Sequence, residues 1–182
     1  MSNYRRSYEG RVFFFTVVTY HRQKILTTKA GRDCLRTAFQ KTMQERPFEV
    51  IAIVLLPNHL YAIWKLPEND TDYSNRWRQI KTLFTRNWHP NENDNKTFSE
   101  SRRKRGEKNV WQRRFFEHTC RDECDLKRCV DYVHVNPLKH RCVERVKDWP
   151  WSTFHRYVRL GEYAEDWGSS QNWFGDEFSF FE

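Results

Sequence analysis

Residues 48–66 read FEVIAIVLLPNHLYAIWKL, and this stretch decides the fold. Residues 48–56 are apolar except for Glu49 and include many β-branched side chains, which is typical of a strand buried on both faces. Pro57 and Asn58 then give a tight-turn signal, and residues 59–66 predict a second strand that returns along the first. The stretch therefore predicts two neighbouring antiparallel strands.

The segments that precede this hairpin predict one strand and one helix. Residues 11–19 (RVFFFTVVT) are aromatic and β-branched, as in a buried strand. A helix capped by Thr27 or Thr28 is expected to run to about Glu45, where Pro47 stops it.

The segments that follow the hairpin predict two more helices and a strand. In order, they are a helix from Asp72 or Ser74 to about Trp88, a strand over residues 115–120 (FFEHTC), and a helix that begins at Asp122 or Glu123 and ends at Pro137. Residues 91–108 are polar and charged, and they predict a surface loop.

The resulting order, β-α-β-β-α-β-α, predicts an α+β protein with a ferredoxin-like antiparallel sheet and helices on one face. An extra C-terminal helix, which carries Tyr132, and an irregular tail complete the chain. We expect one domain over residues 1–182, with a core over about 10–140 and a C-terminal extension over about 141–182.

The charge of the chain favours a polyanionic partner. Lysine and arginine total 32 against 24 acidic residues, so the formal net charge is +8 and the pI is near 9.4. Aromatic residues often stand beside arginine, as in RWR (76–78) and WQRRF (111–115), and such pairs could hold a nucleic-acid backbone and stack on its bases. The alternative, that the aromatic residues are core and the arginines are solvated, stays open.

The cysteines and apolar runs bear on compartment and cofactor. Five cysteines make an odd number, and no paired C-x-x-C spacing suggests a zinc site. The chain starts without an apolar leader, and no apolar run has the roughly 18 residues that a membrane span needs. We therefore expect a reduced cytoplasmic protein that does not contact a membrane.

Two pairs of residues could carry chemistry. His59 and Tyr61 are two apart on a strand, so their side chains leave the same face. Tyr132 and Asn136 are four apart on a helix and share one side of it. Together they could cleave a phosphodiester, with a metal near the phosphate and the phenolate as nucleophile. By spacing alone, a capping histidine and a packing tyrosine explain the same residues.

Five blocks carry a more specific signal. They are LPNHLYAIWKLP (56–67), SNRWRQIK (74–81), VWQRRFFEH (110–118), DYVHVNPLKH (131–140) and DWPWSTFHRY (148–157). In sequence and order, these blocks resemble the REP-associated tyrosine transposases, relatives of the single-tyrosine insertion-sequence transposases. The resemblance spans about residues 4–168, and only the loop at 91–108 is longer than expected.

The resemblance implies a ferredoxin-like core, recognition of palindromic repeats that fold as hairpins with a short 5′ tag, and cleavage of single-stranded DNA. The cut would leave a 5′-phosphotyrosine link and a free 3′-hydroxyl. Tyr132 would be the nucleophile, His59 the first histidine of the H-U-H pair and a metal ligand, and Asn136 the third ligand. The metal would be Mg²⁺ or Mn²⁺, which suit phosphate oxygens and water.

The sequence departs from the family pattern at the second histidine of the H-U-H pair, where it has Tyr61. A phenol, with an ordinary pKa of about 10, must lose its proton to bind a metal well. We therefore expect a weakened metal site and slower cleavage with hairpin binding retained, unless His118 or His134 compensates. A hairpin-binding protein that has lost catalysis, and a generic RNA-binding ferredoxin-like domain, are the alternatives.

The resemblance and the charge pattern also predict how DNA is held. The N-terminal Asn3, Tyr4, Arg5 and Arg6 are candidates to read the tag. Basic residues would neutralise phosphates of the hairpin; the candidates are Arg76, Arg78, Lys81, Arg102, Arg103, Lys104, Arg105, Arg113 and Arg114. The run at 102–105 could equally be a solvated loop. We expect a monomer, although insertion-sequence relatives act as dimers.

Overall fold

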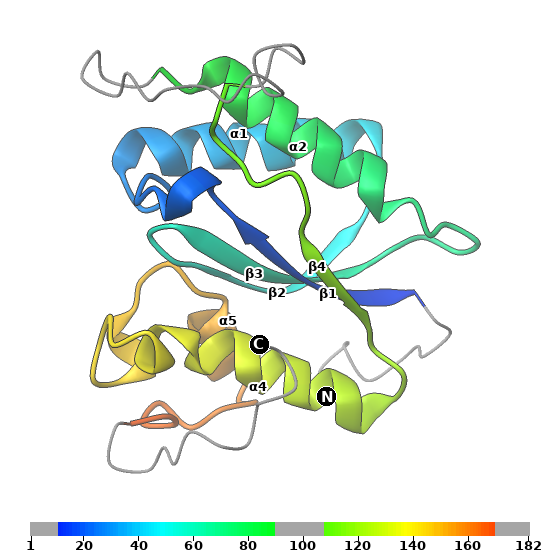
Figure 1. The fold of residues 1–182 in the computed structure, drawn as a ribbon. Helices are drawn as coiled ribbons and strands as arrows, with labels where there is room; N and C mark the ends of the chain where they lie inside the picture. The colour runs from blue at the N-terminus through cyan, green and yellow to red at the C-terminus, as the bar shows by residue number, and fades with distance from the viewer. Residues whose placement is uncertain (1–10, 90–107, 170–182) are drawn as a thin grey trace.

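The computed structural model describes residues 11–89 and 108–169, and these form a four-stranded sheet with helices on both faces (Figure 1). The elements are β1 (Val12–Val18), η2 (Tyr20–Arg22), α1 (Lys29–Glu45), β2 (Glu49–Leu55), β3 (His59–Lys65), α2 (Tyr73–Asn87), β4 (Phe116–Thr119), α4 (Glu123–Lys139), η3 (Val146–Asp148) and α5 (Phe154–Arg159). The strand order is β2-β3-β1-β4 and every neighbouring pair is antiparallel. This confirms the predicted ferredoxin-like α+β fold.

The hairpin at 48–66 forms as predicted. Leu55 pairs with Leu60 across β2 and β3, and the Leu56 amide donates to the His59 carbonyl at 2.9 Å. The carbonyl of Asn58, in the turn, accepts both the amide and the hydroxyl of Thr19 at 2.9 Å. The turn is therefore fixed to the end of β1, which sets where β3 begins.

Side-chain caps place the helix starts. Thr28 accepts the Gly31 amide at 3.0 Å, Asp72 accepts the Asn75 amide at 3.1 Å, and Asp122 accepts the Asp125 amide at 2.9 Å. Each cap satisfies an amide that the first helical turn leaves unpaired. These are among the caps that the sequence predicts.

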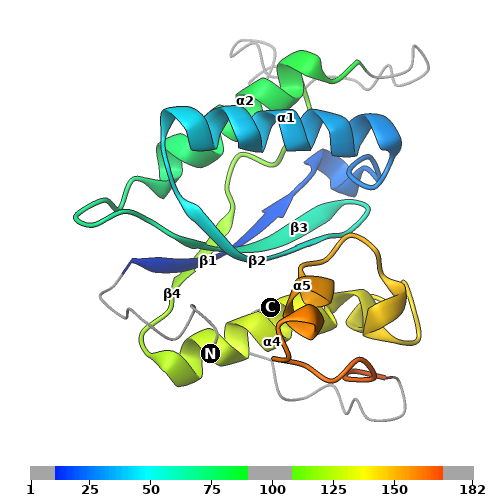
Figure 2. The same cartoon turned by 180° about the vertical axis from the view of Figure 1, so that it is seen from behind.

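One face of the sheet packs against α1 and α2, which lie side by side over it (Figure 2). The layer is mainly aromatic: the rings of Trp64 on β3 and Trp77 on α2 stack with centroids 4.2 Å apart, and Phe15 of β1 lies 4.9 Å from Trp64. These side chains are buried. The two ferredoxin helices share one face, as predicted.

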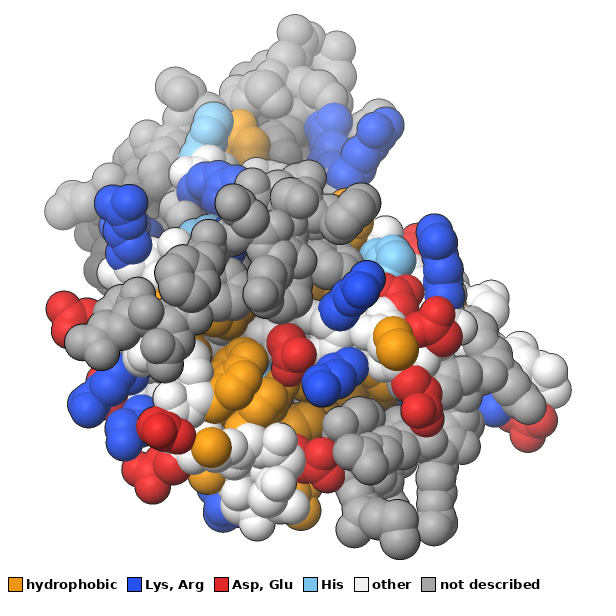
Figure 3. Space-filling view, turned by 90° about the horizontal axis from the view of Figure 1, so that it is seen from below, with side chains coloured by type: hydrophobic (Ala, Val, Ile, Leu, Met, Phe, Trp, Pro, Cys, Tyr) orange, Lys and Arg blue, Asp and Glu red, His pale blue; other side chains and the backbone are white. Residues whose placement is uncertain are grey.

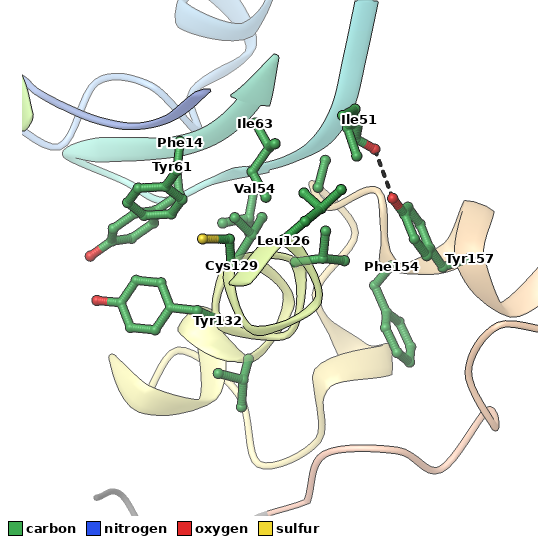
Figure 4. Close-up of a cluster of buried hydrophobic side chains, with 14 of the residues drawn as sticks. Phe14, Ile51, Val54, Tyr61, Ile63, Leu126, Cys129, Tyr132, Phe154 and Tyr157 are labelled. Carbon is green, nitrogen blue, oxygen red and sulfur yellow. Dashed lines mark hydrogen bonds between the residues drawn. The ribbon is translucent and has the colours of Figure 1, made fainter. Parts of the chain in front are cut away.

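The opposite face packs against α4 and the chain that follows it. Trp149 donates its indole N–H to the Leu55 carbonyl at 3.0 Å. The Tyr157 hydroxyl donates to the Ile51 carbonyl at 3.1 Å, as Figure 4 shows. Trp149, Phe154 and Tyr157 are all buried. The extension after residue 141 is therefore part of a packed layer, and over the described residues it is less irregular than the sequence suggested.

Helix α4 does not end at Pro137, so the prediction of its C-terminus is wrong. The helix runs to Lys139, and the His140 amide still donates to the Asn136 carbonyl at 2.9 Å. Proline removes one donor from the helix, and the residues after it can still donate backward. Because the helix continues for two residues after Pro137, His140 directly follows its last turn. No helix among the described residues is long and apolar enough to cross a membrane.

Candidate active site

The site begins where β3 leaves the turn at Asn58. The alternation of the strand sends His59 and Tyr61 to the α4 side of the sheet, and both are buried, at 4% and 6% exposure. Their rings meet edge to face with centroids 5.1 Å apart. His59 and Tyr61, which the sequence predicts on one face of a strand, therefore lie together on that face.

The ring of His59 is oriented from both sides. Its Nδ1 lies 2.5 Å from the Asn58 Oδ1, and its Nε2 lies 3.2 Å from the Nε2 of His140. An amide oxygen can only accept a hydrogen bond, so the ring nitrogen that faces it must be the donor. We therefore assign the proton to Nδ1 and a lone pair to Nε2. Burial, followed by the charges of His140 and Arg22, lowers the pKa of His59 to about 3. His59 is therefore neutral near pH 7 and has a lone pair to offer.

His140 is the residue that the sequence analysis missed. It follows the last residue of α4, and its Nε2 lies 3.4 Å from the Tyr61 hydroxyl as well as 3.2 Å from His59. It was missed because Pro137 was expected to end the helix, whereas the helix carries the chain onward to His140. The sequence did offer one signal: His140 comes eight residues after Tyr132, which is about two helical turns, so a continuous helix would place both on the same side.

Tyr132 of α4 lies against the same cluster. Its ring meets Tyr61 edge to face at 5.4 Å and Phe14 at 5.8 Å, and the side chain is 1% exposed. Figure 4 shows the hydroxyl groups of Tyr61 and Tyr132 on the same side of the cluster. The ammonium of Lys139 lies 5.1 Å from the centre of the Tyr132 ring. These contacts hold the phenol firmly beside a cation.

A cavity of about 340 Å³ joins these groups. Within the described part of the chain, its wall includes two cations, Arg22 and Lys139, and no acidic residue; the lining residues are Thr16, Val18, Arg22, His59, Tyr61, Phe116, Tyr132, Lys139 and His140. Arg22 and its neighbour His21 have φ of 52° and 51°, in the left-handed region that such residues rarely adopt. Strain of this kind gathers at functional sites. The cavity suits an anion that meets a phenol and two imidazoles.

The predicted ligand Asn136 is not part of the cavity wall. It is fully buried, and its amide N–H donates to the Tyr132 carbonyl at 2.6 Å, one helical turn back. Its Oδ1 has no hydrogen-bond partner within the described part of the chain. Metal ligation by Asn136 would need this side chain to turn, whereas His140 already faces His59.

The two histidines that could have compensated for Tyr61 lie elsewhere. His118 faces Asp125, with its Nε2 at 2.9 Å from the carboxylate. His134 is fully buried, its Nε2 lies 2.9 Å from the Thr153 hydroxyl oxygen, and burial lowers its pKa to about 3. Neither contributes to the cavity wall.

Arg76 is not free to contact DNA, so that prediction is wrong. Its side chain is 3% exposed and binds Asp70 through two nitrogens, at 2.7 and 3.1 Å. It also donates to the carbonyls of Arg46, Pro47 and Asp72. The hydrogen bond from Arg76 is the main cause that lowers the pKa of Asp70. The residue ties the start of α2 to the end of α1.

Three other predicted DNA contacts line a second cavity, of about 660 Å³, which we call the α2 groove. Among the described residues, its lining has five basic side chains and no acidic ones, together with three aromatic rings; these residues are Ser74, Trp77, Arg78, Lys81, Thr82, Thr85, Arg86, Lys108, Asn109, Val110, Trp111, Gln112, Arg113 and Phe115. Burial lowers the pKa of Lys81 to about 8, which leaves it mostly protonated near pH 7. By contrast, acidic and basic side chains are interspersed on the face seen in Figure 3, on the α4 side.

The remaining predicted contacts divide by position. Arg114 is exposed beside the α2 groove. Asn3, Tyr4, Arg5 and Arg6, and the run Arg102, Arg103, Lys104 and Arg105, lie outside the described residues.

Comparison with known proteins identifies the family. The model of the family described as "Transposase IS200 like" matches residues 11–136. An Escherichia coli REP-associated tyrosine transposase is 45% identical over 169 residues, covering 92% of this chain and 91% of the relative. The chain belongs to the REP-associated tyrosine transposases, within the IS200-like family.

Further comparisons extend over nearly the whole of this transposase. A Haemophilus influenzae protein of the same group is 45% identical over 171 residues, covering 93% of this chain and 95% of that protein. A solved REP-associated tyrosine transposase bound to a REP hairpin matches with a TM-score of 0.71 and 43% identity, covering 96% of each chain. The helices and strands that build the cavity are therefore those of the family.

Proposed function

We propose that this transposase binds REP-type DNA hairpins and cuts and rejoins single-stranded DNA through a 5′-phosphotyrosine on Tyr132. The observation that carries the proposal is the cavity in which Tyr132 meets His59 and His140 beside basic side chains. The solved relative bound to a REP hairpin supports the choice of DNA. Among the described residues of the cavity wall, the phenol of Tyr132 is the nucleophile that we propose.

The proposed step is a transesterification at phosphorus. Tyr132 loses its proton and its oxygen bonds to phosphorus, the bond from phosphorus to the 3′ oxygen breaks, and that oxygen takes up a proton. Lys139, over the ring, favours the negative charge that develops on the phenolate. Arg22, at the cavity wall, attracts the phosphate. Rejoining is the reverse, with a 3′-hydroxyl as nucleophile.

The donors in the cavity fit a divalent metal, although not through the expected H-U-H pair. His59 and His140 supply two imidazole nitrogens 3.2 Å apart, and Asn58 holds His59 in the tautomer that leaves its Nε2 lone pair available. We propose that these two histidines would hold Mg²⁺ or Mn²⁺, with Asn136 joining only if its side chain turns. When bound, the ion would neutralise negative charge on the phosphate. Tyr61 lies next to the pair with its hydroxyl 3.4 Å from His140.

Binding without cleavage is the second candidate function, and the packing of Tyr61 favours it. The ring lies 5.9 Å from Phe14 and 5.4 Å from Tyr132, and it belongs to the hydrophobic cluster beneath α4. A phenol packed in this way orients its neighbours but is a poorer metal ligand than an imidazole. On this account the chain keeps hairpin binding and cuts slowly or not at all.

We propose that the duplex stem contacts the α2 groove through Arg78, Lys81 and Arg113, with Arg114 beside them. The groove supports this because the charged residues that the structure describes in its lining are all basic. Phe116, 45% exposed at the rim of the cavity, offers a surface on which an unpaired base can stack. Recognition of the tag by residues 3–6, phosphate contacts by residues 102–105 and action as a monomer remain predictions.

The test is a covalent-adduct assay with a panel of REP-type hairpins that carry single-stranded 5′ tags, in Mn²⁺. The wild-type chain should give a protein–DNA adduct that survives denaturation, and Tyr132→Phe should give none. Tyr73→Phe is the matched control. The Tyr73 ring packs in the layer on the α2 side of the sheet, its hydroxyl donates to Glu117, and it is not part of the cavity.

Each outcome of this assay decides between the functions. An adduct that persists in Tyr132→Phe rules out Tyr132 as the nucleophile. If the wild-type chain binds hairpins without an adduct and Tyr61→His restores one, the binding-only function is correct. If neither protein forms an adduct, the proposed cleavage fails for this chain.

A further inference from the structure

A second group of metal-ligating side chains lies where β4 passes into α4. His118 and Cys120 are two apart on extended chain, so they leave the same side, and Asp125 and Cys129 are four apart on the helix. The two pairs meet at the junction of the strand and the helix. None of the four contributes to the wall of the active-site cavity.

Three of these residues bring their ligand atoms close together, and Cys120 lies beside one of the three. His118 Nε2 lies 2.9 Å from the nearer oxygen of Asp125, Cys129 Sγ lies 4.0 Å from the other oxygen, and the sulfurs of Cys120 and Cys129 are 3.7 Å apart. Ligand atoms of His118, Asp125 and Cys129 all lie within 4.8 Å of one another. Zinc–ligand bonds of 2.0 to 2.3 Å in a tetrahedron place ligand atoms about 3.3–3.8 Å apart. To complete the set around one ion, the Cys120 side chain would have to move toward His118 and Asp125.

The surroundings also suit an ion. Cys120 and Cys129 are buried, while His118 and Asp125 are partly exposed, so the group has a protected sulfur side and an open side for entry. The Arg121 amide donates to the Asp125 carboxylate at 2.9 Å and orients it. A hydrogen bond from Cys120 and burial both raise the pKa of the Cys129 thiol. Each thiol that binds an ion would therefore release its proton to solvent.

We propose that His118, Cys120, Asp125 and Cys129 bind a thiophilic divalent cation of the zinc type. Two thiolates, an imidazole and a carboxylate form a donor set that zinc prefers and Mg²⁺ does not. Bound there, the ion would fasten β4 to the helix that carries Tyr132, three residues beyond Cys129. The sequence alone does not predict a zinc site, because the two cysteines are nine apart and lack the C-x-x-C spacing.

Cobalt(II) is the probe of choice, because thiolate ligands give it a charge-transfer absorption band. The reduced full chain, stripped with a chelator, should develop this band and saturate at one equivalent. His59→Ala, which removes a ligand from the active-site cavity, should keep the band. Cys129→Ser should lose most of it, whereas Cys124→Ser, at an exposed cysteine of the same helix, should not.

The proposal is overturned if wild-type protein shows no thiolate band, or if Cys129→Ser leaves the band unchanged. If Cys129→Ser does not fold, Asp125→Asn provides the second test. Zinc at a hundredfold excess over its Kd should raise the Tm of the wild-type chain by about 5 °C or more and that of Asp125→Asn by much less. Equal shifts in the two proteins would mean that zinc acts elsewhere, and that His118 and Asp125 form only an ion pair.

Discussion

The two faces of the sheet use alternate residues of the same strands, yet they differ in what they contain. On β3, Leu60, Ala62 and Trp64 enter the layer under α1 and α2, whereas Tyr61 and Ile63 face α4. The first layer is apolar and closed by stacked rings. The second contains buried hydroxyl and imidazole groups and the cavity around Tyr132.

The difference shows how a small domain can separate stability from chemistry. Because side chains alternate across a strand, one residue can be changed without altering the layer on the opposite face. Aromatic packing on the α1–α2 side fixes the sheet, and the sheet in turn fixes His59 against the end of α4. Substitutions on the two faces should therefore fail in different assays.

The largest effect should come from Trp77→Ala on the α1–α2 face. The ring is 1% exposed and stacks on Trp64, so its loss should lower the free energy of unfolding by about 3–5 kcal/mol. Urea unfolding measures this, with Leu160→Ala, at a 62% exposed side chain, expected to change it by less than about 0.5 kcal/mol. At saturating hairpin, so that any change in DNA affinity at the α2 groove does not enter, the adduct rate per folded molecule should stay as in wild type. A slower rate in fully folded protein would mean that the faces are coupled.

On the α4 face, His140→Ala should slow adduct formation by about 100-fold, equivalent to about 2.7 kcal/mol in the activation barrier. The cause is the loss of the imidazole that faces His59 at 3.2 Å. Hairpin affinity and urea unfolding should change little, because His140 is exposed. His89→Ala, at an exposed histidine beyond α2, is the control. An unchanged rate in His140→Ala would remove this residue from the site.

The importance of His140 marks the limit of what the sequence could predict. The apolar, β-branched runs and the capping residues predicted the fold, and the family resemblance of residues 56–67 and 131–140 singled out His59 and Tyr132. Helix continuation through Pro137 depends on amides after the proline finding carbonyls, which the sequence does not reveal. Likewise, Arg76 looked like a surface cation until its partner Asp70 and three backbone carbonyls were seen around it.

The pH dependence of stability should also come from the α4 face. His134 is buried and its pKa is lowered to about 3, below the ordinary value of 6.5, so the unfolded state binds its proton first. The stabilisation is complete above about pH 6.5 and is lost as the pH falls toward 3, by up to about 1.4 kcal/mol per pH unit. Urea unfolding at several pH values should give a smaller slope for His134→Gln. Equal slopes would show that His134 does not control acid unfolding.

The smallest effect should be in DNA affinity on the α1–α2 side. Arg78→Ala removes one cation from the α2 groove, so the salt dependence of hairpin binding should weaken by about one unit of log–log slope. Affinity measured across a salt series checks this, with Arg159→Ala, an exposed cation on α5, as the control. The same slope in Arg78→Ala and wild type would place the stem elsewhere.

The central claim is that Tyr132, in the cavity with His59 and His140, is the residue that joins DNA. Protease digestion of the wild-type adduct, followed by mass spectrometry of the DNA-linked peptide, tests it directly. We expect nucleotide mass on the peptide that contains Tyr132 and on no peptide that contains Tyr61. Nucleotide mass on any other residue, with the Tyr132 peptide unmodified, would contradict it.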